Sequence, residues 1–249
     1  MQCGIYEYKT IKIRYRMNEY TNLQISSNPA LHIASVSRCP SINFFNVDCI
    51  EFMKSKPDKC YDLAIVDPPY GIGDVFIPVS TGAKPCKIER THKVMKWDNE
   101  IPTAEYFEQL KRVSKKQIIW GANYFNCFET GGALIWYKNN GAPTLSQCEI
   151  ASLSFKKCVD YVFVQQLGGF VQKNKPIHPT QKPIKLYRWI LQQYAKQGDK
   201  ILDTHGGSHT NAIACEMEGF DLDICEIDAE YFQAGVNAFN LHKRQQRLF

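Results

Sequence analysis

The 249-residue sequence has no uninterrupted apolar run approaching about 18 residues, so it predicts no transmembrane helix. It also lacks the pattern of a secretory signal peptide, because Lys9, Lys12, Arg14 and Arg16 interrupt the apolar residues near its start. Together these absences predict a cytoplasmic protein without a membrane partner. Hydrophobic residues make up 44% and charged residues 22%, a balance typical of globular domains and unlike collagen or disordered tails.

Metal-binding and phosphate-binding signatures are also missing. The ten cysteines contain no C-x-x-C pair, so they are interpreted as small buried apolar side chains in a reducing compartment. His205 and His209 are four residues apart, but no H-E-x-x-H pattern or third ligand accompanies them. No G-x-x-x-x-G-K-[ST] loop occurs either. The sequence therefore predicts no metal and no phosphate-binding loop of that kind.

Basic residues are unevenly distributed in a chain of net charge +5. Residues 81–97 hold five basic side chains against one acid, Glu89, and residues 165–190 hold five with no acid. Such segments are either solvated basic faces or contacts for a polyanionic partner. The candidate contacts are Lys84, Lys87, Arg90, Lys93, Lys96, Lys173 and Lys175.

Strand and helix patterns alternate along most of the chain, which predicts an α/β fold with a mostly parallel sheet. Residues 1–40 are predicted to be an N-terminal extension, and residues 71–100 a long loop. The segments 149–155 and 161–164 are expected to form an antiparallel pair. Strands are predicted at 42–47, 62–66, 117–120, 133–137, 149–155, 161–164, 200–202 and 222–225, and helices at 49–54, 103–114, 184–195, 211–218 and 229–241. Asp48 and Thr103 are the candidate N-caps of the first two helices.

The sequence Asp67-Pro68-Pro69-Tyr70 follows the apolar strand at 62–66. The two prolines fix the backbone and remove two N–H donors, which leaves local carbonyls as acceptors. Asp67 and the Pro68 carbonyl can each accept an N–H from an exocyclic amine, while Tyr70 can stack on its ring. The alternative interpretation is a strand that ends in a turn with an exposed tyrosine.

A glycine-containing turn, Asp203–Thr210, joins a predicted strand to a predicted helix. Glycines there allow close approach of a ligand, and the helix start offers free N–H groups. Glu226 follows at the end of the next strand, where an acid binds ribose hydroxyls in nucleoside-binding folds. Two acids would repel phosphates, so the pocket suits a positively charged ligand such as a sulfonium.

These motifs, with His178-Pro179-Thr180-Gln181-Lys182-Pro183 between them, resemble the beta-class amino-methyltransferases of DNA. Trp97-Asp98, the 120–125 segment and Glu226–Asp228 also resemble recurring phrases of that family. The resemblance spans about residues 42–239. It implies a Rossmann-like methyltransferase fold with a seven-stranded, mostly parallel sheet, one antiparallel strand and a circularly permuted motif order. It makes residues 41–249 the catalytic domain.

The resemblance also implies roles for individual residues. Asp67, Pro68, Pro69 and Tyr70 match the catalytic motif, Glu226 the ribose-binding acid and Asp48 the acid near the cofactor's adenine. Lys182 is a candidate partner for the methionine carboxylate. The cofactor-binding residues implied for S-adenosylmethionine are Asp48, Cys49, His178, Thr180, Lys182, Pro183, Asp203, Thr204, His205, Gly206, Gly207, Ser208, Glu226 and Ile227.

The implied activity is S-adenosylmethionine-dependent methylation of the exocyclic N6 of a flipped-out adenine in double-stranded DNA, as in restriction–modification systems. Residues 71–100 and 165–178 are the candidate DNA-recognition loops. Both are short for segments that recognise a DNA sequence, which favours a short recognition sequence or a homodimer. Cytosine-N4 methylation is the alternative, although serine commonly replaces Asp67 in those enzymes. His209 stands where the family has glycine. Two alternatives therefore stay open: cofactor binding is weakened, or the protein is an inactive DNA-binding relative.

Overall fold

The computed structural model describes residues 39–72, 100–139, 146–165 and 181–246. These residues all belong to one compact unit, 38–249. The predicted division of the chain at residue 40 stays a prediction, because residues 1–38 lie outside the described residues. Among the described helices, none has the length and apolar character needed to cross a membrane.

The described strands form one eight-stranded sheet in the order β1-β8-β7-β2-β3-β5-β4-β6. Only β5 among them runs antiparallel to its two neighbours. The mixed α/β sheet with one antiparallel strand is therefore confirmed, with one strand more than the resemblance implies. The strands are β1 (Ile42–Phe45), β2 (Tyr61–Val66), β3 (Ser114–Trp120), β4 (Ala133–Tyr137), β5 (Cys148–Leu153), β6 (Val159–Phe163), β7 (Lys200–Asp203) and β8 (Asp221–Cys225).

The predicted antiparallel pairing of 149–155 with 161–164 is wrong. β4 lies between these strands and pairs with β5 in antiparallel and with β6 in parallel orientation, so that Ile135 faces both Ile150 and Tyr161. The hydroxyl of Thr130, before β4, donates to the carbonyl oxygens of Leu153 and Lys156 at 2.6 Å. These bonds hold the β5–β6 connection against the start of β4, a long-range contact that strand periodicity does not encode.

The helices follow the predicted segments closely. Asp48 and Thr103 cap α1 and α2 as predicted, each accepting main-chain N–H groups through its side chain. α3 was not predicted, because four residues are too few to show a helical period. The helices are α1 (Cys49–Lys54), α2 (Ala104–Val113), α3 (Ala122–Phe125), α4 (Ile184–Tyr194), α5 (Thr210–Glu218) and α6 (Ala229–Gln246).

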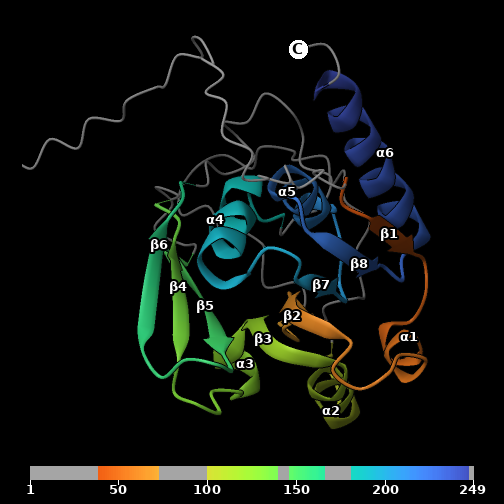
Figure 1. Cartoon of the computed structure of the whole chain (residues 1–249). Helices are drawn as coiled ribbons and strands as arrows, with labels where there is room; N and C mark the ends of the chain where they lie inside the picture. The colour runs from red at the N-terminus through yellow and green to blue at the C-terminus, as the bar shows by residue number, and fades with distance from the viewer. Residues whose placement is uncertain (1–38, 73–99, 140–145, 166–180, 247–249) are drawn as a thin grey trace, which may run out of the picture. The chain divides into compact units, whose positions relative to one another are not determined.

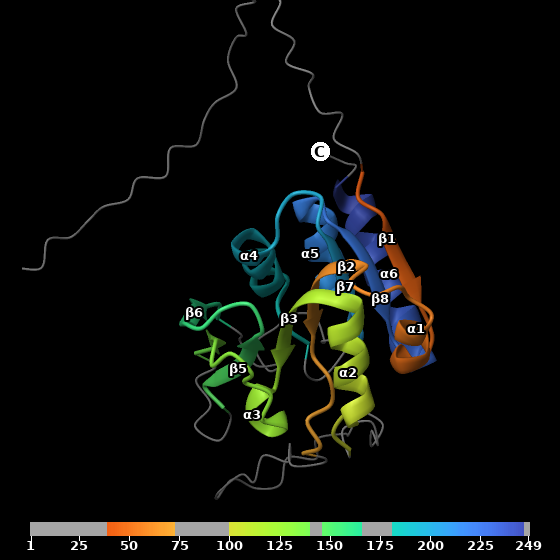
Figure 2. The same cartoon turned by 60° about the horizontal axis from the view of Figure 1, so that its bottom comes forward.

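Helices cover both faces of the sheet (Figure 1). α4, α5 and Phe239 of α6 pack on one face, against residues such as Leu63 and Ile65 of β2. α1 and α2 pack on the other face, against Ala64 and Val66 of the same strand. Alternate residues of β2 therefore lie in two different hydrophobic cores, one on each face of the sheet. Because both faces are buried, the strand is a continuous apolar run. Figures 1 and 2 both place α6 beside β1 at one edge of the sheet and β6 at the other.

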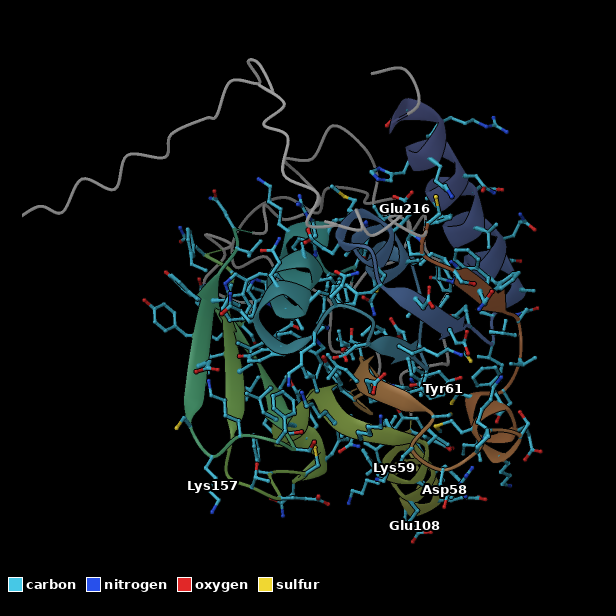
Figure 3. The ribbon with its side chains drawn as sticks, viewed as in Figure 1. Asp58, Lys59, Tyr61, Glu108, Lys157 and Glu216 are labelled. Atoms are coloured by element: carbon cyan, nitrogen blue, oxygen red, sulfur yellow. The ribbon has the colours of Figure 1, made fainter. Side chains whose placement is uncertain are left out.

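Side chains fasten the amino ends of the central strands. Tyr61, labelled in Figure 3, begins β2 and donates its hydroxyl to Asp223 Oδ2 at 2.7 Å. Lys59 Nζ donates to the carbonyl oxygens of Lys111 and Ser114, at 2.5 and 3.1 Å. These contacts tie β2 to β3 and β8 at the end opposite the predicted site. The carboxyl ends of the same strands are left to carry functional side chains.

Candidate functional site

Asp67 leaves the carboxyl end of β2 with both carboxylate oxygens engaged. Its Oδ1 accepts the Tyr70 hydroxyl at 2.6 Å, and its Oδ2 accepts Lys182 Nζ at 2.5 Å. Lys182 Nζ also lies 3.3 Å from the Tyr70 hydroxyl. The side chains of Asp67 and Lys182 are 17% and 2% exposed, so this pairing is sheltered from water. The catalytic motif and the 178–183 motif therefore meet through one ion pair.

Lys182 contacts a second carboxylate, Glu149 of β5. The Lys182 Nζ–Glu149 Oε2 distance is 3.1 Å, and Lys138 Nζ lies 3.0 Å from Glu149 Oε1. The ammonium of Lys182 also lies 5.2 Å from the centre of the Trp120 ring, within cation–π range. Two acids and two bases thus alternate in the order Asp67, Lys182, Glu149 and Lys138.

Burial and pairing act in opposite directions on these carboxyl groups. Burial raises the pKa of Asp67, only partly offset by Lys182, and the negative charge of Glu149 raises it further. Burial would also raise the pKa of Glu149, but the Lys182 and Lys138 ammonium groups hold it below its ordinary value. Burial would lower the pKa of Lys182, but the two carboxylates keep it above its ordinary value. The surroundings thus shift the pKa of Asp67 upward and that of Glu149 downward.

The Tyr70 ring is held by aromatic contacts from α3 and the turn before it. It stacks on Tyr124 with ring centroids 4.9 Å apart and planes 15° apart, and meets Phe125 edge-on. A Cβ at Gly121 would lie 2.3 Å from Tyr70 Cε1, and Gly121 has φ +74°. Only glycine fits this position without displacing the ring. The 120–125 segment noted in the sequence therefore supports the Tyr70 ring.

At the end of β8, Glu226 fastens the glycine-containing turn. Its Oε2 accepts the Gly207 N–H at 2.7 Å, and its Oε1 accepts the Asp228 N–H at 2.9 Å. The Gly206 N–H donates to the Cys225 carbonyl at 2.7 Å. Burial raises the pKa of Glu226 although these N–H donors lower it. Each carboxylate oxygen has a further lone pair, so Glu226 retains acceptor capacity toward a ligand.

Asp203 and His205 begin the same turn and are buried. Asp203 accepts the His205 N–H at 3.1 Å and Asn211 Nδ2 at 2.9 Å. Burial raises the pKa of Asp203 to about 7 and lowers that of His205 to about 4. His205 Nδ1 lies 2.9 Å from Thr204 Oγ1, and its Nε2 lies 4.0 Å from Cys49 Sγ. At neutral pH this imidazole is uncharged.

His209 adopts the backbone conformation for which the family uses glycine, with φ +56° and ψ +26°. Its ring is fully buried, with Phe44 and Phe232 nearby, and Cβ atoms at Gly206 and Gly235 would lie within 2.6 Å of it. Neither ring nitrogen has a hydrogen-bond partner among the residues that the structure describes. Burial lowers the pKa of His209 to about 4. The side chain points into the protein and does not line the cavity.

A cavity of about 280 Å³ joins the two motifs. It brings together nine of the predicted site residues from the ends of β2, β7 and β8 and from the start of α4. Those nine are Asp67, Pro69, Lys182, His205, Gly206, Gly207, Ser208, Glu226 and Ile227; Gln181, Tyr187, Thr210, Asp228 and Tyr231 complete the lining. The cavity is thus lined by acids and by turn backbone at one end, and by the Asp67–Lys182 pair at the other.

The remaining predicted residues fall into three groups. Asp48 caps α1, while Thr204 and Asp203 lie beneath the turn; these side chains support the cavity rather than line it. Pro68, Tyr70, Cys49 and Pro183 flank it. His178, Thr180 and the basic candidates Lys84, Lys87, Arg90, Lys93, Lys96, Lys173 and Lys175 lie outside the described residues. No cluster of three potential metal-ligating side chains occurs in the described ranges.

Sequence reasoning missed several residues of the site. Glu149 and Lys138 are distant from every motif, and their meeting with Lys182 depends on the position of β5 beside β3. Tyr187 and Tyr231 line the cavity from α4 and α6 but read as ordinary apolar helix positions. Tyr124 lies within the 120–125 segment noted in the sequence, but no sequence pattern predicted that its ring stacks on Tyr70. No sequence pattern marked the carboxylate of Glu149.

Residues 136–237 match a family described as DNA methylase. This segment carries the Lys182 contact, the Asp203–Thr210 turn and Glu226. The match covers 102 of the 249 residues, from 136 to 237. It includes β5 and β6, so the Lys182–Glu149 pair lies within the matched segment.

Two curated proteins are similar to most of this chain. Type II methyltransferase M2.MboI of Moraxella bovis is 24% identical over 70% of this chain and 78% of its own length. DNA adenine methyltransferase YhdJ of Escherichia coli is 22% identical over 78% of this chain and 81% of its own length.

Two solved structures share the fold of this chain. The M1.HpyAVI–SAM complex has a TM-score of 0.52 at 20% identity and covers 79% of this chain and 99% of its own. The cytosine-N4-specific PvuII DNA methyltransferase has a TM-score of 0.54 at 14% identity and covers 80% of this chain and 86% of its own. The predicted methyltransferase fold is thereby confirmed.

Proposed function

We propose that this protein transfers a methyl group from S-adenosylmethionine to the exocyclic N6 of an adenine in double-stranded DNA. The observation that carries the proposal is the cavity that has Asp67 and Pro69 at one end and Glu226 and the 206–208 turn at the other. A methyl donor and an amine acceptor can meet there. The relative named as a DNA adenine methyltransferase, YhdJ, supports the choice of base.

The donor set at the turn fits S-adenosylmethionine. Glu226 offers carboxylate acceptors to ribose hydroxyls, and the acids that surround the turn favour a sulfonium over a phosphate. Gln181, Tyr187 and Tyr231 supply polar and aromatic lining. When bound, S-adenosylmethionine supplies an electrophilic methyl group on a good leaving group. Positioning of the amine therefore carries most of the catalysis.

Asp67 and the Pro68 carbonyl hold the amine in this proposal. An adenine in a duplex must leave the stack to reach them, which costs a few kcal/mol. Stacking on an aromatic ring returns about 1–3 kcal/mol, and Tyr70 offers that ring. The Tyr70 hydroxyl donates to Asp67 Oδ1, so the incoming amine uses the second lone pair of that oxygen or replaces the hydroxyl. Basic residues 84–96 and 173–175 are proposed to contact phosphates, which position DNA without reading its sequence.

The test is methyl transfer from labelled S-adenosylmethionine to unmethylated DNA, followed by nucleoside analysis. We expect N6-methyladenine; N4-methylcytosine would keep the chemistry and overturn the base assignment. Absence of product together with absence of calorimetric cofactor binding would instead support an inactive DNA-binding relative, the alternative that the strained His209 favours.

Asp67→Ala is the matched variant. Because Asp67 is the acceptor for the amine and lies at the far end of the cavity from the turn, this change should abolish methyl transfer and leave cofactor affinity within about threefold of wild type. Calorimetry with S-adenosylmethionine measures the second quantity. An active Asp67→Ala enzyme would contradict the role assigned to the carboxylate.

A further inference from the structure

Two sheltered carboxylates share the single ammonium of Lys182. Asp67 Oδ2 is 2.5 Å from Nζ and forms a hydrogen bond with it. Glu149 Oε2 forms a longer ion pair with Nζ, at 3.1 Å. Glu149 thus offers Lys182 a second, more distant acceptor position.

The proposed reaction needs the Asp67 oxygens that are engaged in the structure. The Tyr70 hydroxyl and Lys182 Nζ take one oxygen each. Each Asp67 oxygen keeps a second lone pair, but the ammonium on Oδ2 withdraws negative charge from the carboxylate, so an incoming amine binds Asp67 more strongly when Lys182 moves away. Tyr70 can give up its bond by a small shift, whereas the fully buried Lys182 ammonium needs another anion, because an unpaired buried charge is costly.

We propose that Glu149 is a positioning residue that accepts the Lys182 ammonium when the target amine binds to Asp67. The inference rests on the methyl transfer proposed above. Lys138, 3.0 Å from the other oxygen of Glu149, keeps this receiving carboxylate ionised and in place. The Trp120 and Tyr70 rings, 5.2 and 5.9 Å from Nζ, provide faces over which the ammonium moves.

The shift of Lys182 gives Asp67 a second task after bond formation. The amine nitrogen forms the N–CH3 bond as the C–S bond breaks, and the electron pair of that bond goes to sulfur. The nitrogen then carries a positive charge and loses one proton. Asp67 takes this proton more readily when Lys182 is paired with Glu149, because a departing positive charge makes a carboxylate more basic.

The groups that face Asp67 come from every element packed around it. Lys182 lowers its pKa, and Glu149 and burial raise it, while Tyr70 lowers it through its hydrogen bond. Asp203, Tyr187 and Tyr106 also interact with it electrostatically. Loss of the Glu149 charge therefore lowers the pKa of Asp67 for two reasons. It removes a repulsive negative charge, and it leaves the Lys182 ammonium paired with Asp67.

The experiment compares Glu149→Gln with wild type in steady-state methyl transfer across pH. Glutamine keeps the size of the side chain but cannot hold the ammonium as an anion. We expect kcat at neutral pH to fall about tenfold with KM for DNA changed less than about threefold, and the acidic limb of the kcat profile to move down by about one pH unit. Glu129→Gln, which removes the exposed partner of Lys111, is the control and should match wild type.

An unchanged kcat in Glu149→Gln would overturn the inference. So would a lower kcat with an unmoved acidic limb, since a purely structural role would produce that result. Carboxyl NMR of the ligand-free protein, with the Asp67 signal assigned through Asp67→Asn, gives a readout that needs no turnover. If wild type transfers no methyl group, the proposed function fails, and the Asp67 titration midpoint still decides the coupling: it falls in Glu149→Gln or the inference is wrong.

Discussion

The two ends of the cavity stabilise buried acids by different means. At the catalytic end, Asp67 and Glu149 are paired with the ammonium groups of Lys182 and Lys138. At the turn end, Glu226 and Asp203 accept main-chain N–H groups and an amide, and the neighbouring imidazoles are neutral at pH 7. One end is a charged side-chain network and the other depends on backbone geometry.

The difference matches what each end is proposed to hold. A neutral amine at the catalytic end needs an acceptor whose charge can be adjusted, and a mobile ammonium provides that adjustment. A sulfonium at the turn end needs negative charge without a competing cation. Neutral His205 beside Asp203 satisfies this requirement, since a protonated ring would repel the ligand.

The largest expected effect is a loss of folding stability at acidic pH, caused by a residue at the turn end. His209 has a pKa of about 4 in the folded protein against 6.5 for an exposed histidine. Between these values the unfolded chain binds a proton that the folded chain does not, so stability is present above pH 6.5 and is lost as the pH falls. His209 alone should lower the free energy of unfolding by about 1.4 kcal/mol per pH unit, or by about 3 kcal/mol between the two pKa values.

His209→Asn tests this, because asparagine tolerates the left-handed conformation and does not titrate. His205 contributes in the same direction and Asp203, with its raised pKa, in the opposite one, but both are common to the two proteins. Urea unfolding at neutral pH and at about pH 4.5 should show wild type losing more stability than the variant. Equal losses would mean that the turn end is not the acid-sensitive region.

The next effect concerns the acid that fastens the turn. Glu226→Gln keeps the side-chain size but replaces one N–H acceptor with an amide donor, so the Gly207 or Asp228 contact is lost. We expect S-adenosylmethionine affinity to fall about 10–100-fold, since a hydrogen bond to a charged group contributes about 1.5–3 kcal/mol. Calorimetry measures it.

Asp221→Asn, at the opposite end of β8, is the matched control for Glu226→Gln. Asp221 accepts the Ser41 N–H at 2.7 Å, far along the strand from the turn. It should bind the cofactor as wild type does. A similar loss in both variants would indicate a general weakening of the strand and would remove the special place given to Glu226.

The sequence predicted the backbone better than the charge network. Local signals placed the caps Asp48 and Thr103 and the strand before Asp67, because each depends on residues within a few positions. The pairing of β4 between β5 and β6 was mispredicted because strand order depends on contacts distant in sequence. Glu149 was missed for the same reason.

Position 209, where this chain has histidine and the family has glycine, was singled out from the sequence. Position 209 has a positive φ of +56°, the conformation that favours glycine. The direction of the ring, away from the cavity and toward Phe44 and Phe232, followed from no local pattern. Whether cofactor binding is weakened stays a prediction, with backbone strain rather than ring volume as its physical basis.

A smaller effect sharpens the role of the catalytic ring. Tyr70→Ala removes the stacking surface and should lower kcat/KM for DNA about tenfold, within the range of one aromatic–base stack. Tyr70→Phe keeps the ring and frees Asp67 Oδ1 from the hydroxyl, so its kcat/KM should stay within about threefold of wild type. Steady-state methyl transfer measures both, and equal losses would show that the hydroxyl, not the ring, is the required group.

The smallest effect isolates the backbone at position 209. His209→Gly and His209→Ala both delete the buried ring, but only glycine adopts φ +56° without a steric penalty. The glycine variant should therefore unfold with a free energy about 1 kcal/mol higher than the alanine variant. At exposed Glu108 of α2, labelled in Figure 3, the order should reverse, because alanine favours a helix over glycine by about the same amount. Urea unfolding of all four variants gives both differences. If glycine and alanine were equal at position 209, the turn would relax when the ring is lost, and side-chain packing rather than backbone conformation would define that end of the cavity.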